Sequence, residues 1–135
     1  MNDCLFCNII AGEIPSEKIY EDEKTFAFLD INPVNPGHTL VLPKTHAINI
    51  FDITAEDWGA VMETVRTLAT PIREAVGADG INIHVNNEEA AGQKVFHSHI
   101  HIIPRLTDDG LKHWEHTPYK DGEIDVVREK ITAAL

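Results

Sequence analysis

Three histidines occupy alternate positions in the stretch VFHSHIHIIP. Side chains alternate between the two faces of a β-strand, so a strand here would place His97, His99 and His101 on one face, about 6.7 Å apart along the chain. Ile100 and Ile102 would point to the opposite face and enter the core. A row of imidazoles can bind a metal ion, transfer protons or attack phosphorus as a nucleophile.

Three interpretations of this row stay open on the residues alone. The row could be an incidental polar strand face. It could hold a catalytic zinc ion with an open fourth position, although the outer pair, about 13 Å apart by strand rise, would converge poorly on one ion. Alternatively, one imidazole could form a covalent bond to phosphorus while its neighbours orient it and supply protons.

A glycine-containing loop precedes the histidines and could hold the phosphate that such a reaction requires. In AAGQK, Ala91 and Gly92 allow the backbone to approach a ligand closely, and amides in a turn point at anions. Such a loop alone is a weak signal. Its position just before the histidine strand makes a phosphate site a stronger prediction.

The remaining pattern predicts the elements that position these residues. Apolar residues at helical spacing in DCLFCNII predict a short N-terminal helix, which Gly12 and Pro15 end. Thr54 should cap one long amphipathic helix, which Pro71 should kink or end. Strands are expected at Ile19–Tyr20, Thr25–Ile31, 38–43, 81–87 and 96–104, and a C-terminal amphipathic helix at Ile124–Leu135. Short connections favour antiparallel pairing, so we expect an α+β domain with about five antiparallel strands.

Size and charge restrict the class of protein. A chain of 135 residues and 15.1 kDa fits one domain, and a formal net charge of −11 argues against nucleic acid as a partner. No apolar run approaches the roughly 20 residues that span a bilayer, so no membrane partner is expected. Asp3 stands where a secretory signal carries positive charge, which predicts a cytoplasmic protein with reduced cysteines.

The histidine region resembles the signature of the histidine-triad (HIT) superfamily. The likeness rests on NNEEAAGQKVFHSHIHIIPR, on YEDEKTFAFLDINPVNPGHTLVLPKTH upstream, and on CLFCNIIAGEIP near the start. These segments extend over most of residues 4–105. The nearest branch is that of the small bacterial-type HIT proteins and nucleoside phosphoramidases. The chain is therefore interpreted as a single HIT domain, 1–135, with a core at about 4–105 and a C-terminal extension at 106–135.

The resemblance implies a fold, an assembly and an activity. The fold would be a five-stranded antiparallel sheet with one long helix and a short N-terminal helix, joined in a homodimer into a ten-stranded sheet. The activity would be hydrolysis or nucleotidyl transfer at the α-phosphate of a purine nucleotide, through a covalent nucleotidyl group on His99. Water would then release an AMP-type product. The alternative is a nucleotide-binding adaptor with vestigial hydrolysis.

The resemblance also assigns roles to residues. It makes His99 the nucleophile and gives phosphate contacts and proton donation to His101 and His38. Asp30 would accept two ribose hydroxyls, or else simply cap the turn that follows it. The phosphate loop would comprise Asn86, Gly92, Gln93 and the amide of Lys94. The base pocket would be lined by Leu5, Phe6, Ile9, Phe28 and Ile31, residue types that are otherwise common in a core.

One position departs from the family pattern. Lys94 stands where phosphoramidase-type members commonly carry serine. The contact of that hydroxyl with the leaving group is then missing, and lysine would bring positive charge to the phosphates instead. This departure leaves the substrate class open between phosphoramidates and dinucleoside polyphosphates.

The two cysteines, Cys4 and Cys7, form half of a tetrahedral zinc site. The resemblance supplies the other half, His46 of the PKTH turn and His97, the first histidine of the row. The zinc would be structural and closed to solvent, and the alternative is a pair of buried free thiols. By the same resemblance, Trp114 in the C-terminal extension would close over the pocket of the partner subunit.

Overall fold

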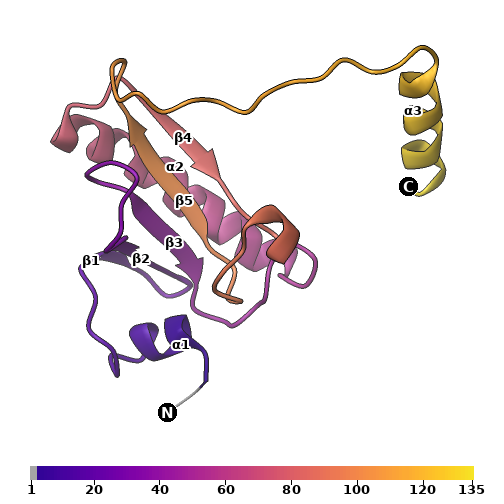
Figure 1. The fold of residues 1–135 in the computed structure, drawn as a ribbon. Helices are drawn as coiled ribbons and strands as arrows, with labels where there is room; N and C mark the ends of the chain where they lie inside the picture. Colours follow the sequence, from indigo (N-terminus) through magenta and orange to yellow (C-terminus); the bar gives the residue numbers. More distant parts are fainter. Residues whose placement is uncertain (1–2) are drawn as a thin grey trace.

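A computed structural model describes residues 3–135, which form one antiparallel sheet with a helix against each face and a C-terminal arm (Figure 1). The strands are β1 (Lys18–Glu21), β2 (Thr25–Leu29), β3 (Thr39–Pro43), β4 (Gly80–His84) and β5 (Ile100–Arg105). The helices are α1 (Leu5–Ile10), α2 (Ala55–Val76), the single 3₁₀ turn η1 (Glu89–Ala91) and α3 (Glu123–Ala133). The strand order is β1-β2-β3-β5-β4, and the predicted α+β fold is confirmed.

The long helix α2 begins and ends where the sequence predicts. The Thr54 hydroxyl accepts a hydrogen bond from the Asp57 amide, and Gly77 ends the helix in the left-handed conformation with φ of 65°. Pro71 lies inside the helix without ending it. Pro71 lies on the exposed side of the helix. Proline has no amide hydrogen, so the carbonyl one turn earlier lacks its helical partner, and water can hydrate that carbonyl here.

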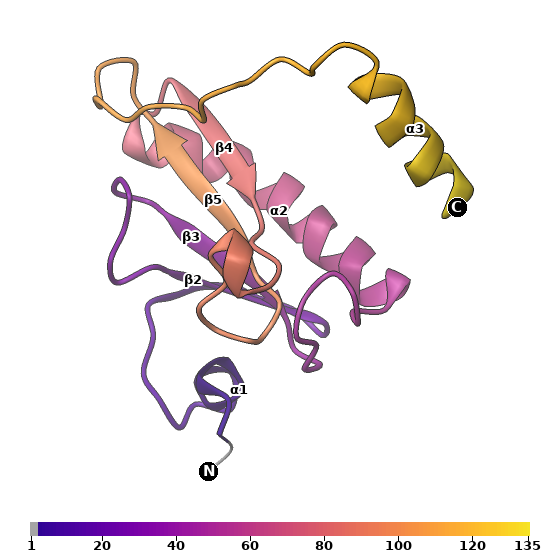
Figure 2. The same cartoon turned by 45° about the vertical axis from the view of Figure 1, so that its right-hand side comes forward.

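The two faces of the sheet carry separate apolar clusters. The larger cluster packs α2 on the sheet, through Ala27, Val41, Val61, Val65, Leu68, Ile72, Ile100 and Ile102 (Figure 2). The smaller packs α1 on the other face, through Phe6, Ile9, Phe26, Phe28, Leu40 and Leu42. Ile100 and Ile102 thus enter the main core as predicted. The histidine face, expected to lie apart from the core, is instead partly covered by α1 and its aromatic cluster.

The predicted strand 96–104 begins later than expected, at Ile100. Val41 pairs with Ile100, and β3 ends two residues on at Pro43, which has no amide hydrogen to donate to a ladder. His97 and Ser98 therefore lie beside the turn after β3 without a regular ladder. They make two isolated hydrogen bonds there, from His97 Nε2 to the Pro43 carbonyl (2.8 Å) and from the Ser98 amide to the Ala47 carbonyl (2.7 Å).

The strand predicted to reach Ile31 ends at Leu29. The Asp30 carboxylate accepts a hydrogen bond from the Asn32 amide at 2.8 Å and so starts the turn towards β3. This turn carries Asp30 and Ile31 to the edge of the histidine face.

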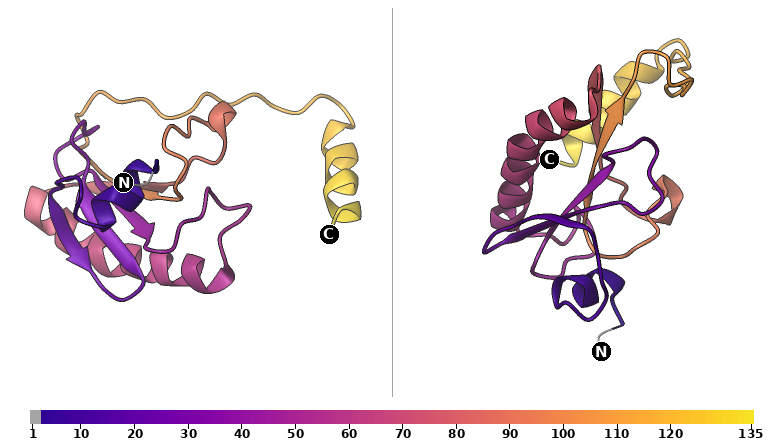
Figure 3. Two further views of the ribbon diagram at one scale, coloured as in Figure 1. Left: turned by 90° about the horizontal axis from the view of Figure 1, so that it is seen from below. Right: turned by 90° about the vertical axis from the view of Figure 1, so that its left-hand side faces the viewer.

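The C-terminal arm, residues 106–135, leaves the sheet after β5 and extends away from it (Figures 1 and 3). Its helix α3 begins one residue before the predicted span 124–135 and ends two residues before the end of that span. None of the residues of α3 is buried. Trp114 in the arm is 86% exposed. Within residues 3–135, no helix is long and apolar enough to cross a membrane.

Candidate active site and metal centre

A cavity of about 520 Å³ opens on the histidine face of the sheet. Its walls come from α1, the segment after β2, the loop between β4 and β5, and the start of β5. Of the residues predicted to bind substrate, all but Gln93 line it. These are Leu5, Phe6, Ile9, Phe28, Asp30, Ile31, Asn86, Gly92 and Lys94. Of the three predicted catalytic histidines, His99 and His101 line the cavity and His38 does not.

The backbone selects the protonated nitrogen of His99. His99 Nδ1 lies 2.7 Å from the His97 carbonyl oxygen, which can only accept, so Nδ1 carries the proton and Nε2 keeps its lone pair. The ring is 8% exposed and meets the Phe6 ring edge-on at 5.0 Å. Burial lowers the pKa of His99, so the imidazole is neutral at pH 7.

His38 lies outside the cavity lining and determines which nitrogen of His101 carries the proton. The Val34 amide donates to His38 Nδ1 at 3.0 Å, so a neutral His38 carries its proton on Nε2. That nitrogen lies 2.8 Å from His101 Nδ1 and donates to it, which leaves the His101 proton on Nε2. Burial, aided by His99, His84 and His38, lowers the pKa of His101 to about 3. His38 therefore orients His101 and does not line the cavity.

One histidine near the site was not assigned from the sequence. His84 is the register partner of His101 across β4 and β5, and their ring centroids are 4.8 Å apart. It is exposed, yet burial of the ring lowers its pKa. The alternation of Ile81, Ile83 and Val85 already placed His84 on the opposite strand face. Only the pairing of β4 with β5 shows that this is the histidine face.

The half of the cavity near α1 is apolar. The rings of Phe6 and Phe28 meet edge-on at 5.5 Å, and both side chains are buried. Leu5 and Ile31, at 44% and 84% exposure, form its rim. Asp30 stands beside this half with one carboxylate oxygen 3.7 Å from His38 Nε2. This half can take a flat apolar group next to hydroxyls.

Gln93 holds the loop between β4 and β5 rather than lining the cavity. Its amide nitrogen donates to the carbonyls of Ile48 (2.7 Å) and Val95 (3.1 Å). Its oxygen accepts from the Asn49 side chain (3.1 Å) and from the Glu88 amide (2.9 Å). The side chain is 3% exposed, so all of its hydrogen bonds are internal. Gln93 thereby fixes the backbone on both sides of the loop.

The predicted zinc ligands gather at one point. His97 Nδ1 lies 3.5 Å from the sulfurs of both Cys4 and Cys7 and 3.2 Å from His46 Nδ1, which lies 3.4 Å from Cys7 Sγ. All four ligand atoms are within 4.8 Å of one another. In a tetrahedron around zinc, nitrogen and sulfur donors lie about 3.3–3.8 Å apart, so the set fits the ion.

The protonation states at this cluster also suit a metal. His97 Nε2 donates to the Pro43 carbonyl, which leaves the lone pair on Nδ1, the atom that faces the sulfurs. Burial lowers the pKa of His97 to about 4. Burial and the neighbouring Cys4 raise the pKa of Cys7 to about 11, so a metal would displace a proton. His46 is exposed, so the expectation of a site closed to solvent is wrong on that side.

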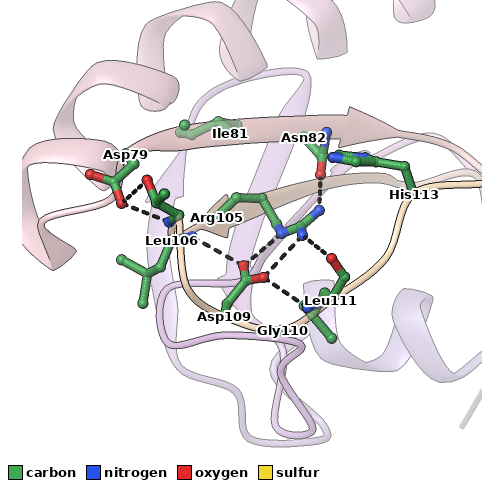
Figure 4. A pocket seen from close by; sticks show the side chains of 11 residues that line it. Asp79, Ile81, Asn82, Arg105, Leu106, Asp109, Gly110, Leu111 and His113 are labelled. Carbon is green, nitrogen blue, oxygen red and sulfur yellow. Dashed lines mark hydrogen bonds and ion pairs between the residues drawn. The ribbon is translucent and has the colours of Figure 1, made fainter.

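A second cavity of about 570 Å³ lies at the far end of β4 and β5 (Figure 4). Its centre is the Arg105 guanidinium, which donates to both carboxylate oxygens of Asp109 (2.8 and 3.1 Å) and to Asn82 (2.7 Å). The Leu111 carbonyl accepts another hydrogen bond at 3.2 Å. Because these groups satisfy one another, they fix the start of the C-terminal arm.

The fold places a row of histidines beside a cavity, and sequence comparison identifies the family. The HIT domain family matches residues 11–108, so the chain belongs to this family. The protein named hit of Bacillus subtilis is 52% identical over 103 residues, which cover 76% of this chain and 71% of that protein. The adenylylsulfatase HINT3 of Arabidopsis thaliana is 44% identical over 110 residues, covering 82% of this chain and 56% of that protein.

Solved structures support the same assignment. SMU.412c of Streptococcus mutans superposes with a TM-score of 0.93 at 43% identity, covering 99% of this chain and 86% of that one. A zinc-bound histidine triad family protein of Mycobacterium smegmatis superposes with a TM-score of 0.78 at 36% identity, covering 98% of each chain. The family therefore includes at least one hydrolase by name and one zinc-bound structure.

Proposed function

We propose that the protein hydrolyses a purine nucleotide, or transfers its nucleotidyl group, at the α-phosphorus through a covalent bond to His99 Nε2. The observation that carries this proposal is the state of His99. Its Nδ1 proton is held by the His97 carbonyl, and the ring carrying the free Nε2 lines a cavity of nucleotide size.

The reaction then has two balanced steps. His99 Nε2 attacks the α-phosphorus, a nitrogen–phosphorus bond forms, and the bond to the leaving group breaks with its electron pair on the leaving atom. An amine leaving group takes up a proton from water as it departs, whereas a phosphate leaves as the anion. The His97 carbonyl stabilises the positive charge that the imidazole ring acquires. Water next attacks phosphorus, the nitrogen–phosphorus bond breaks, and a nucleoside monophosphate and a proton leave.

The walls of the cavity suit the parts of such a substrate. The apolar half around Phe6 and Phe28 can receive the base, and the Asp30 carboxylate can accept ribose hydroxyls. The His101 Nε2 proton faces the phosphate side together with Asn86. Neutral donors can therefore bind the phosphate oxygens without a cluster of basic residues.

The test is a rapid-quench experiment with adenosine 5′-phosphoramidate and diadenosine triphosphate labelled in the adenylyl group. Labelled protein should accumulate transiently, and peptide mapping should find the label on His99. Label on another residue, or turnover with no labelled protein in single-turnover conditions, would reject the covalent step. Tight AMP binding with no turnover of either substrate would favour the adaptor.

We propose that Cys4, Cys7, His46 and His97 hold a structural zinc ion. When bound, zinc would link α1 to the turn after β3 and to the segment before β5, because each contributes ligands. The donor set, the ligand distances and the zinc-bound relative support the ion. Protein purified without added metal should contain about one zinc per chain by elemental analysis, and a content near zero after growth with zinc would reject the site.

We propose that the protein is a homodimer in which the C-terminal arm contacts the partner subunit. An isolated helix as short as α3 is marginal in water, and its apolar residues are exposed, as Ile131 at 58% and Trp114 of the arm at 86% illustrate. A solved relative superposes over 99% of this chain, which includes the arm. This supports an arm with a defined position. Sedimentation should give a dimer, and a chain truncated after residue 111 should dissociate more readily. A monomer at micromolar concentration would reject the assembly.

A further inference from the structure

Among the lysines and arginines of residues 3–105, Lys94 stands out because its charge has no partner within that segment. Within residues 3–105, the other lysines and arginines all have acceptors. The ion pairs are those of Lys18 and Lys44 with Glu21, Lys24 with Glu56, Arg66 with Glu63 and Arg105 with Asp109. Arg73 donates to the carbonyls of Ala78 and Asp79. Lys94 makes no hydrogen bond or ion pair with the rest of this segment.

The place of this free charge is the mouth of the histidine cavity. Lys94 is exposed and lines the cavity, and it directly follows Gln93, whose buried side chain anchors the loop by four hydrogen bonds. The backbone at Lys94 is thus held while its side chain is free to reach a ligand. Its amide hydrogen also has no backbone partner within the described chain.

Among the described residues that line the cavity, Lys94 is also the only one with a fixed positive charge. The other titratable side chains that line it are Asp30, His99 and His101. Burial lowers the pKa of both imidazoles and so keeps these two rings neutral. The whole protein carries a net charge of −11, so its field repels a polyanion. The α-phosphate can be bound by neutral donors. A cation at the mouth can bind further negative charge that lies beyond the α-phosphate.

We infer that Lys94 sets the specificity of the proposed reaction for substrates whose leaving group is anionic, a phosphate or polyphosphate, over those that release an amine. The inference rests on the proposed function. For a dinucleoside polyphosphate, the bond from His99 Nε2 to the α-phosphorus forms as the bond to the bridging oxygen breaks. The nucleoside polyphosphate leaves with that electron pair, and Lys94 binds its terminal charge.

The experiment compares two substrates in three proteins. Adenosine 5′-phosphoramidate releases ammonia and diadenosine triphosphate releases ADP, while both form the same adenylyl–enzyme. The ratio of kcat/KM for the triphosphate to that for the amidate should fall about tenfold or more in Lys94→Gln, the effect of one charge-assisted hydrogen bond. Lys94→Arg should keep most of the ratio. Arg66→Gln, which removes one positive charge from the outside of α2, should leave the ratio unchanged.

A ratio that is the same in wild type and Lys94→Gln would overturn the inference, even if both substrates are turned over. Calorimetric titration of ADP and AMP provides a second measurement that needs no turnover. The wild type should bind ADP more tightly than AMP, and Lys94→Gln should lose that preference. An absence of turnover would reject the proposed function alone. If the ratio of ADP affinity to AMP affinity is the same in wild type and Lys94→Gln, the role of Lys94 alone is rejected.

Discussion

Two histidines of the row donate from different ring nitrogens: His97 at the proposed zinc site, called the metal end, and His99 at the proposed substrate site, called the nucleotide end. His97 donates from Nε2 to the Pro43 carbonyl and so presents Nδ1 to two thiols and His46. His99, two residues on, donates from Nδ1 to the His97 carbonyl, so that Nε2 is its free nitrogen. The same side chain thus offers Nδ1 at the proposed zinc site and Nε2 at the proposed site of attack on phosphorus.

The role of an imidazole is therefore not determined by residue type alone. Burial makes both rings neutral, so each offers one lone pair. The carbonyl that accepts the hydrogen bond from one ring nitrogen decides which nitrogen offers its lone pair, and in which direction. We therefore expect the two ends to respond separately to mutation, with chemistry lost at one and stability lost at the other.

The largest expected effect is at the nucleotide end. His99→Ala should lower kcat/KM by at least about 10⁴-fold, because no other group can form the covalent intermediate. AMP affinity, measured by calorimetry, should change little, since the apolar half of the cavity and Asp30 stay intact. His116→Ala, in the exposed arm, is the control and should keep full activity. Wild-type turnover in His99→Ala would show that His99 is not the nucleophile.

The next effect is at the metal end. Cys7→Ser should reduce the zinc content from about one per chain to near zero and lower stability by about 2 kcal/mol or more, which corresponds to a fall in Tm of about 5–10 °C. His46→Cys should retain zinc, because a site of three cysteines and one histidine also binds it. Activity per folded molecule should change only a few-fold. Immediate and complete loss of activity on chelation would instead mean that the metal takes part in the chemistry.

The contrast between the two ends could be predicted only in part from the sequence. The types and spacing of Cys4, Cys7 and the histidines predict both clusters, and Thr54 and Gly77 predict the limits of α2. These signals are local. The tautomers depend on carbonyls that only the folded chain brings near, such as that of Pro43, which is 54 residues from His97.

Long-range pairing also explains the remaining differences. His84 joins the site because β4 pairs with β5, and no local pattern fixes that register. Gln93 carries the residue type of a phosphate ligand, but its four hydrogen bonds go to the chain itself, two of them to residues 48 and 49. The start of β5 depends on the end of β3 at Pro43, which has no amide hydrogen to donate.

A smaller effect should follow from removing the residue that orients His101. His38→Leu should lower kcat about 10–100-fold with little change in AMP affinity, as is usual for loss of an orienting partner. His38→Gln keeps an amide donor toward His101 Nδ1 and should recover part of the activity. The pH–rate profile should shift in the leucine variant and return in the glutamine variant. Equal rates and profiles in both variants would make His38 a packing residue only.

The smallest expected effect is on stability against pH. His101 is faced by His38 at the start of β3, by His84 from β4, and by His99 from its own chain, with Asp30 beyond His38. Its pKa falls from the ordinary 6.5 to about 3 on folding, so below pH 6.5 the unfolded chain binds the extra proton. Stability from this group is complete above pH 6.5 and falls as the pH decreases towards 3.

Between pH 6.5 and 5.5 the loss from His101 should be roughly 1 kcal/mol in urea unfolding experiments. His101→Asn cannot bind that proton, so its stability should fall less over the same interval. His116→Asn, in the exposed arm, should follow the wild type. If the stability of His101→Asn falls with pH in parallel with that of the wild type, this imidazole is hydrated in the folded protein. The neutral state of the imidazoles at the nucleotide end would then need another cause than burial.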